Sequence, residues 1–154
     1  MTNLDALYQE VILEHNRRPK NFGPMEGADR ELRGRNPSCG DSLTLWLKFD
    51  GDAVADARFT GEGCAISKAS ASMMTAAVKG KSRAEAEALF ERVHRMLTGT
   101  LPEAERKSLG SLVALAGVAR FPNRVKCASM AWHTLHEGLQ TPGGDAAPVP
   151  AGQG

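Results

Sequence analysis

The chain has 154 residues, of which 42% are hydrophobic and 24% charged, proportions that suit one globular domain with a hydrophobic core. Its formal net charge is +1, so no electrostatic footprint for nucleic acid is expected. No apolar run approaches the length of a membrane span, and the polar N-terminus lacks the hydrophobic segment of a secretion signal. These features predict a cytoplasmic protein with neither a nucleic-acid nor a membrane partner.

The N-terminal half predicts one helix followed by a hairpin. Apolar residues at helical spacing favour an amphipathic helix that ends near His15. Residues 19–41 are rich in Gly, Pro and Asn and are expected to be mostly loop, with room for one edge strand. Apolar and polar residues then alternate over 43–49, a pattern typical of a half-buried strand, and Asp50-Gly51 is a turn signal after which residues 53–60 return.

The C-terminal half predicts helices. Residues 65–78 are mostly small or apolar, without Gly or Pro, and favour a helix that packs closely on a sheet. A capping box predicts the next helix, a short helical segment is expected near 103–117, and Pro122 suits the start of the last helix.

The expected fold is therefore α+β, a small antiparallel sheet packed by several helices over residues 1–140. Residues 141–154 are Gly-, Pro- and Ala-rich with little to bury, and are expected to be a disordered tail.

Three cysteines in a reducing compartment are hard to explain as disulfides, because their number is odd. They could be small core residues, which is a common role for cysteine. Cys64, however, is predicted at the start of one helix and Cys127 in the first turns of another. Unpaired amides and the dipole at a helix N-terminus favour the thiolate, the form that binds metal.

Cys39 lies in a predicted loop and is followed two residues later by Asp41. Three thiolates and one carboxylate form a tetrahedral set suited to zinc. Without the cysteines, Asp41 would be better explained as a turn-capping residue, and the cysteine spacing is not that of a zinc finger or ribbon. His133 and His136 lie about two helical turns beyond Cys127 and are not expected to be ligands.

Three motifs in order resemble the IscU/NifU-N family of iron–sulfur cluster assembly proteins. They are Asn-Pro-Ser-Cys-Gly-Asp at 36–41, Gly-Glu-Gly-Cys-Ala-Ile-Ser-Lys-Ala-Ser-Ala-Ser at 61–72, and Arg-Val-Lys-Cys at 124–127. The resemblance implies an IscU/SufU-like fold. It also implies that the metal ligands are the four residues Cys39, Asp41, Cys64 and Cys127.

Two departures from the cluster scaffolds of this family make the chain similar to the SufU branch of the SUF system. The members of that branch are zinc-dependent sulfurtransferases. Lys126 stands where cluster scaffolds carry a histidine, and residues 121–126 replace the scaffolds' Leu-Pro-Pro-Val-Lys segment. The resemblance implies a pyridoxal-phosphate-dependent, SufS-like cysteine desulfurase as sulfur donor and a separate iron–sulfur scaffold complex as recipient. We interpret Cys39 as the catalytic sulfur acceptor, because a loop cysteine can move while helix-borne cysteines are held by packing.

Two alternatives stay open at this point. The same ligands could assemble iron as a [2Fe–2S] cluster, which would make the protein a scaffold rather than a sulfurtransferase. They could also form a closed, inert structural zinc site.

Overall fold

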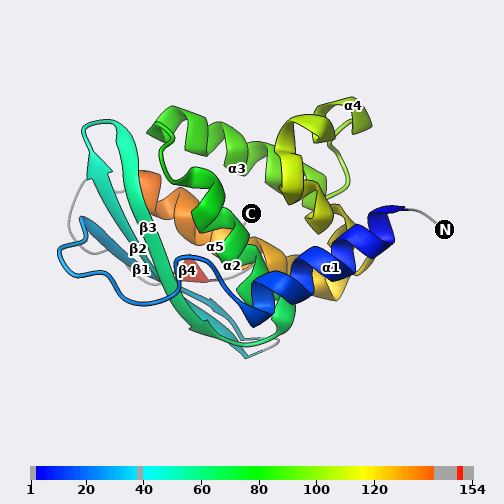
Figure 1. Cartoon of the computed structure of the whole chain (residues 1–154), viewed down its shortest axis with the longest axis horizontal. Helices are drawn as coiled ribbons and strands as arrows, with labels where there is room; N and C mark the ends of the chain where they lie inside the picture. Colours follow the sequence, from blue (N-terminus) through cyan, green and yellow to red (C-terminus); the bar gives the residue numbers. More distant parts are fainter. Residues whose placement is uncertain (1–2, 38–39, 141–148, 151–154) are drawn as a thin grey trace.

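The computed structural model describes residues 3–37, 40–140 and 149–150, so Cys39 lies outside the described part of the chain. The chain runs from a first helix through three strands into a series of helices, and a short strand follows them (Figure 1). In chain order they are α1 (Asn3–Arg17), β1 (Arg30–Asn36), β2 (Asp41–Asp50), β3 (Ala53–Glu62), α2 (Ala65–Val78), α3 (Arg83–Leu97), α4 (Glu103–Arg106), the 3₁₀ helix η1 (Lys107–Arg120), α5 (Pro122–Gln140) and β4 (Val149–Pro150). The expected α+β fold is confirmed.

The sheet has the strand order β3-β2-β1-β4, with antiparallel pairing among β1, β2 and β3. The predicted hairpin is β2 and β3. β1 occupies the segment expected to be mostly loop, and its register runs from Arg30 opposite Leu47 to Asn36 opposite Asp41. Of the expected disordered tail, the described residues are Val149 and Pro150, which pair in parallel with Gly34 and Arg35.

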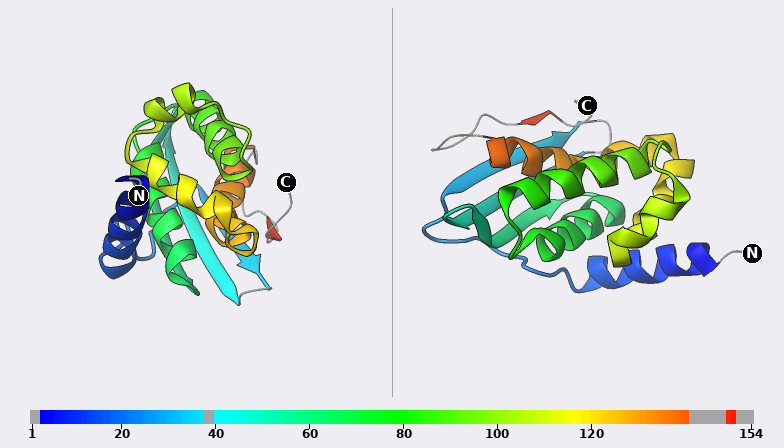
Figure 2. Two further views of the ribbon diagram at one scale, coloured as in Figure 1. Left: turned by 90° about the vertical axis from the view of Figure 1, so that its right-hand side faces the viewer. Right: turned by 90° about the horizontal axis from the view of Figure 1, so that it is seen from above.

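The helices lie on one face of the sheet (Figures 1 and 2). Along β2 the inward side chains Leu43, Leu45 and Leu47 are buried, whereas Trp46 points to the other face, where its Nε1 donates to Glu31 Oε1 at 3.0 Å. α5 contacts β1 and β2, and α2 contacts β3. α1, α3 and η1 form an outer layer on α2 and α5.

α2 and α5 are joined by a buried hydrogen-bond network at Ser70. Its hydroxyl donates to the carbonyl oxygen of Ala128 at 2.6 Å and accepts from Trp132 Nε1 at 3.1 Å. α5 also lies very close to β1, because a Cβ at Gly34 would collide with Thr134 Oγ1. The small residues of α2 and this glycine therefore let α5 lie close to both α2 and the sheet.

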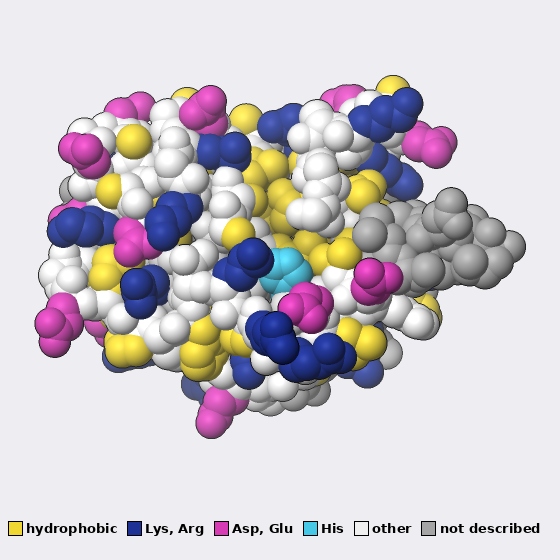
Figure 3. Space-filling model, viewed as in Figure 1, with side chains coloured by type: hydrophobic (Ala, Val, Ile, Leu, Met, Phe, Trp, Pro, Cys, Tyr) yellow, Lys and Arg dark blue, Asp and Glu magenta, His cyan; other side chains and the backbone are white. Residues whose placement is uncertain are grey.

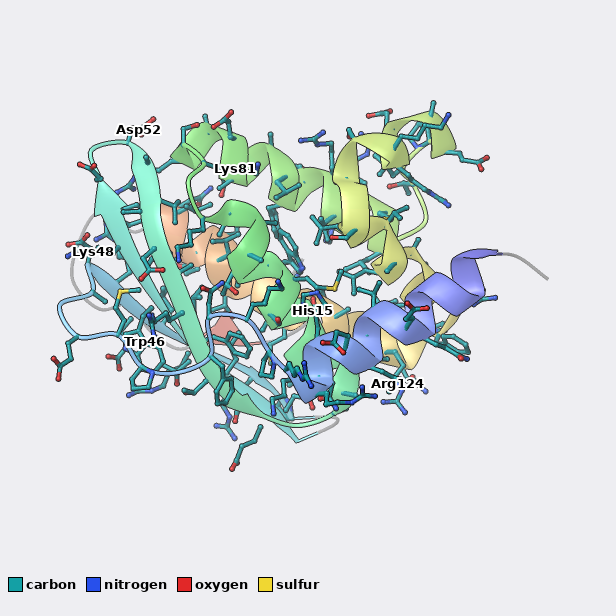
Figure 4. All side chains as sticks on the ribbon, viewed as in Figure 1. His15, Trp46, Lys48, Asp52, Lys81 and Arg124 are labelled. Carbon is teal, nitrogen blue, oxygen red and sulfur yellow. The ribbon has the colours of Figure 1, made fainter. Side chains whose placement is uncertain are left out.

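α1 is fixed on α2 through Ser72, a fully buried residue whose hydroxyl accepts from the backbone N–H of Lys20 at 2.7 Å. His15 Nδ1 lies 2.7 Å from the same oxygen, and the figure shows His15 on the side of α1 that faces α2 (Figure 4). Burial, with a smaller contribution from Lys20, lowers the pKa of His15. The neutral imidazole can then accept the hydroxyl hydrogen of Ser72.

The predicted helix starts are confirmed, while one helical segment differs in kind. Ser82 and Glu85 form the expected capping box at the start of α3. The segment expected near 103–117 is α4 followed by η1, which has a kink at Gly110, where φ is 58°.

Positive and negative side chains are intermixed on the face drawn in Figure 3. Within the described ranges, no helix has the length and apolar character needed to cross a membrane.

Removal of residues 141–154 should leave the fold intact. The only described pairing that this deletion removes is the two-residue contact of β4 with the edge of β1. We expect a chain ending at Gln140 to keep its far-ultraviolet circular dichroism spectrum and to unfold within a few degrees of the full chain. A large fall in the unfolding temperature would show that β4 supports the sheet and that the domain extends beyond residue 140.

Stability should also fall in mild acid because of His133. Burial lowers the pKa of His133 to about 4, and the nearby His94 and His136 act in the same direction. The ring also packs edge-on against Phe90, with centroids 5.5 Å apart. Between pH 4 and 6.5 the unfolded chain binds more protons at this site than the folded chain, so the free energy of unfolding decreases as pH falls through that window.

For His133 this contribution is about 3 kcal/mol between pH 8 and pH 4. His133→Phe, which keeps an aromatic ring but cannot titrate, should be less sensitive to acid over the same range. Urea unfolding at a series of pH values would measure the difference. Parallel pH profiles for the wild type and this variant would contradict the prediction.

Candidate metal centre

Asp41 is the first residue of β2, and its carboxylate links the sheet to α2. The residue is 2% exposed, and its Oδ1 accepts a hydrogen bond from the backbone N–H of Cys64 at 2.8 Å. Cys64 occupies the N-cap position of α2 and makes no side-chain capping bond of its own. Asp41 therefore provides, from the sheet, a hydrogen-bond acceptor for an amide at the start of α2. Its other oxygen, Oδ2, lies 3.9 Å from Cys64 Sγ.

The residue before Cys64 must be a glycine in this arrangement. Gly63 has a φ of 140°, a conformation that other L-residues rarely adopt. A Cβ at this position would also collide with the carboxylate of Asp41. The Gly-Cys pair thus brings the backbone of the β3–α2 junction directly against the side chain of Asp41.

Cys127 supplies the second sulfur from α5, which begins at Pro122 as predicted. The residue is fully buried, and its Sγ lies 3.9 Å from the carbonyl oxygen of Asn123. The two sulfur atoms and one carboxylate oxygen, contributed by Asp41, Cys64 and Cys127, all lie within 4.8 Å of one another. Three elements that are far apart in the sequence therefore meet at one point.

This donor set fits a metal ion with tetrahedral coordination. Two thiolates and a carboxylate oxygen are three of the four ligands that zinc commonly takes, and thiolates also hold iron–sulfur clusters. Among the residues that the structure describes, this is the one cluster with three side chains suited to metal binding. The structure brings together three of the four predicted ligands, while the fourth, Cys39, lies outside the described residues.

The two histidines of α5 take part in other contacts. His136 Nδ1 lies 2.8 Å from Glu87 Oε1 on α3, and its ring stacks on Phe90 with centroids 4.5 Å apart. His133 packs against Phe90 and His94. Neither histidine is part of the metal-binding cluster of Asp41, Cys64 and Cys127.

Asn36 is a site residue that the sequence analysis did not single out. It is the last residue of β1, is 1% exposed, and lies opposite Asp41 in the strand register. Its Nδ2 donates to Asp41 Oδ2 at 3.3 Å and approaches Cys127 Sγ at 3.6 Å. Asn36 opens the motif at 36–41, but only the register between β1 and β2 brings its amide to the site, so the motif alone assigned it no role.

An open hollow lies beside the site, at the first turns of α2 and α5. It has a volume of about 410 Å³ and is lined by Ala65, Ile66, Phe121 and Arg124. Phe121 is 48% exposed, and Arg124, labelled in Figure 4, is exposed as well. Of the residues that line it, Ala65 and Ile66 directly follow Cys64, and Arg124 lies one helical turn before Cys127. The hollow therefore provides an apolar and cationic surface next to the cysteines.

Comparison with known proteins identifies close relatives across nearly the whole chain. The chain is 44% identical over 137 residues to the zinc-dependent sulfurtransferase SufU of Bacillus subtilis, covering 89% of this chain and 92% of that protein. It is also 44% identical over 140 residues to the iron–sulfur cluster assembly scaffold protein IscU of Streptococcus pyogenes, covering 91% of this chain and 87% of the other.

Solved structures agree with the fold. A protein from Fervidobacterium islandicum, described as an iron–sulfur cluster assembly scaffold for the SUF system, superposes with a TM-score of 0.81 at 36% identity. The match covers 88% of this chain and 98% of the other. The N-terminal NifU-like protein of Brucella abortus has the same fold, with a TM-score of 0.71 at 22% identity over 87% of this chain and 92% of the other.

The family assignment rests on most of the chain and agrees with the resemblance found in the three motifs. The family model of the NifU-like N-terminal domain matches residues 7–128, which include Asn36, Asp41, Cys64 and Cys127. The chain therefore belongs to the NifU-like N-terminal domain family, and its relatives include SufU of Bacillus subtilis.

Proposed function

We propose that this protein works in iron–sulfur cluster assembly as a zinc-dependent sulfur acceptor. It would take persulfide sulfur from a cysteine desulfurase and pass it to a cluster scaffold. The observation that carries the proposal is the meeting of Asp41, Cys64 and Cys127 within 4.8 Å, in a chain 44% identical to a zinc-dependent sulfurtransferase. Zinc, when bound, would supply a positive charge that keeps the thiols deprotonated without any redox chemistry.

Cys39 is the proposed acceptor and the proposed fourth ligand. It stands two residues before Asp41, and chain connectivity keeps two such residues within about 7 Å of each other. Cys64 and Cys127 are held at the starts of helices, and Cys127 is fully buried. Because packing restrains the other two cysteines, we take Cys39 as the thiol that meets the donor.

The transfer itself is thiol exchange. The Cys39 thiolate attacks the terminal sulfur of the desulfurase persulfide, a new S–S bond forms on Cys39, and the S–S bond to the desulfurase cysteine breaks. The desulfurase cysteine leaves as a thiolate, and the proton of the terminal sulfur stays with that sulfur. No oxidant or reductant is needed, because the sulfane sulfur only changes partner.

The proposed partners are those that the family resemblance implies. The donor is a pyridoxal-phosphate-dependent, SufS-like desulfurase, and the recipient is a separate iron–sulfur scaffold complex. The hollow between Ile66 and Phe121, with Arg124 at its side, is a surface on which a donor could lie next to the cysteines. Since an acceptor must keep its thiols reduced, we place the protein in the cytoplasm.

A second function, assembly of a [2Fe–2S] cluster on the same cysteines, is favoured by the 44% identity to the Streptococcus pyogenes scaffold. Protein purified without oxygen would separate the two. A brown protein that contains iron and sulfide indicates the scaffold, whereas a colourless protein with one zinc indicates the sulfur acceptor. Stimulation of a cysteine desulfurase by the colourless protein then separates the acceptor from a purely structural zinc site.

Loss of a helix-borne ligand should lower metal content and stability together. Metal binding to a folded site adds to the free energy of unfolding, by about 10 kcal/mol in small zinc peptides and by less in a domain with its own core. We therefore expect Cys64→Ser and Cys127→Ser to contain less zinc and to unfold at lower temperature. Ser129→Ala, also on α5, is the matched control and should keep its zinc. An unchanged unfolding temperature after complete chelation of the wild type would refute the coupling.

Substitutions of Cys39 and Asp41 should have different effects on sulfur transfer. Cys39→Ser should retain some zinc, still bind the desulfurase, and accept no sulfur. Asp41→Ala should bind metal in altered geometry and accept much less sulfur, and it also removes the carboxylate that accepts from the amide of Cys64. Asp41→Asn keeps an oxygen acceptor for that amide, and so separates loss of the metal ligand from loss of the helix cap.

Mass spectrometry after incubation with desulfurase and cysteine would locate the added sulfur on one peptide. The mass increase is expected on the peptide that contains Cys39. Sulfur on the Cys64 or Cys127 peptide, with Cys39 unmodified, would show that another cysteine is the acceptor.

A further inference from the structure

We infer that Asn36 is a positioning residue of the metal centre, because its side-chain amide ties the carboxylate of Asp41 to the sulfur of Cys127. The inference rests on the proposed metal site but not on sulfur transfer.

The position of Asn36 results from strand register. Asn36 and Asp41 are directly opposite each other at the ends of β1 and β2, so their side chains emerge on the same face of the sheet. This is the face on which α5 packs, and there Nδ2 of Asn36 meets both Asp41 Oδ2 at 3.3 Å and Cys127 Sγ at 3.6 Å. One amide nitrogen carries two hydrogens, so it can donate to both atoms at once.

Asn36 also completes the hydrogen bonding of a buried carboxylate. Oδ1 of Asp41 accepts from the backbone N–H of Cys64, while Oδ2 receives the amide of Asn36. A carboxylate that is 2% exposed and adjacent to two thiols needs such donors, since an unpaired buried charge is very unfavourable. The amide supplies partial positive charge without adding a formal charge to the site.

The contact with sulfur has a consequence that packing alone would not have. An N–H donor withdraws electron density from a thiolate, and such outer contacts orient metal ligands and tune the metal that they hold. Removing the donor should raise the energy of the sulfur lone pairs of Cys127. The charge-transfer absorption from sulfur to a bound cobalt ion should therefore move to longer wavelength.

The test uses the full-length protein stripped of metal and reloaded with Co²⁺, in the wild type, Asn36→Ala and Asn36→Ser. The alanine variant has no donor, while the serine hydroxyl can donate to one of the two acceptors. We expect the cobalt charge-transfer band to shift to longer wavelength in Asn36→Ala and to shift less in Asn36→Ser. Zinc affinity, measured by competition with a chelator, should fall by about 10- to 100-fold in Asn36→Ala.

Trp46→Phe is the matched control. It also removes a side-chain N–H donor, the one that reaches Glu31 Oε1 at 3.0 Å, on the face of the sheet opposite to α5 and the metal-binding cluster. This variant should keep the wild-type cobalt spectrum and zinc affinity. Circular dichroism of the metal-free proteins should show that all variants are folded.

Three results would overturn the role of Asn36. They are a wild-type cobalt spectrum and zinc affinity in Asn36→Ala, weaker zinc binding with an unshifted band, and equal effects in Asn36→Ala and Trp46→Phe. Each of them leaves the metal site itself in place. A wild-type protein that binds neither Co²⁺ nor Zn²⁺ would instead overturn the metal site, and the proposed function with it.

Discussion

The hydrogen bond from the backbone N–H of Cys64 to the carboxylate of Asp41 is the contact on which the site depends. It joins the first residue of β2 to the start of α2, although all of β3 lies between them in sequence. The amides at a helix start need acceptors, and the side chain of the N-cap residue, Cys64, does not provide one. Because Asp41 provides the acceptor from the sheet, the same residue that caps α2 also directs its second oxygen toward the sulfur of Cys64.

The close approach of α5 is the second constraint. Ser70 on α2 donates to the carbonyl oxygen of Ala128, the residue after Cys127, so this hydrogen bond sets the distance between the two helices directly beside Cys127. Gly34 leaves the space that Thr134 of α5 occupies on the other side. The small residues of α2 and the glycine of β1 are therefore features of the site as well as of the core, since bulkier side chains would move Cys127 away from Cys64.

Periodicity and capping signals were sufficient to predict α2, the capped start of α3, the β2–β3 hairpin and the start of α5, because these depend on neighbouring residues. β1 was less clear, since most of its residues are charged and few side chains besides Leu32 point to the core. The role of Asn36 could not be predicted, because it requires the register between two strands. The role of Cys39 stays a prediction.

The two oxygens of Asp41 have separate partners, so one carboxylate caps a helix and also presents an oxygen to the metal-binding cluster. Oδ1 holds the start of α2 through the amide of Cys64, whereas Oδ2 faces the sulfurs and Asn36. A carboxylate is also the hardest and most exchangeable ligand in a set dominated by thiolates. Asp41 would therefore hold a metal ion through Oδ2 while Oδ1 keeps its bond to the amide at the start of α2, so the cap of the helix and the ligand to the metal would not compete for one oxygen.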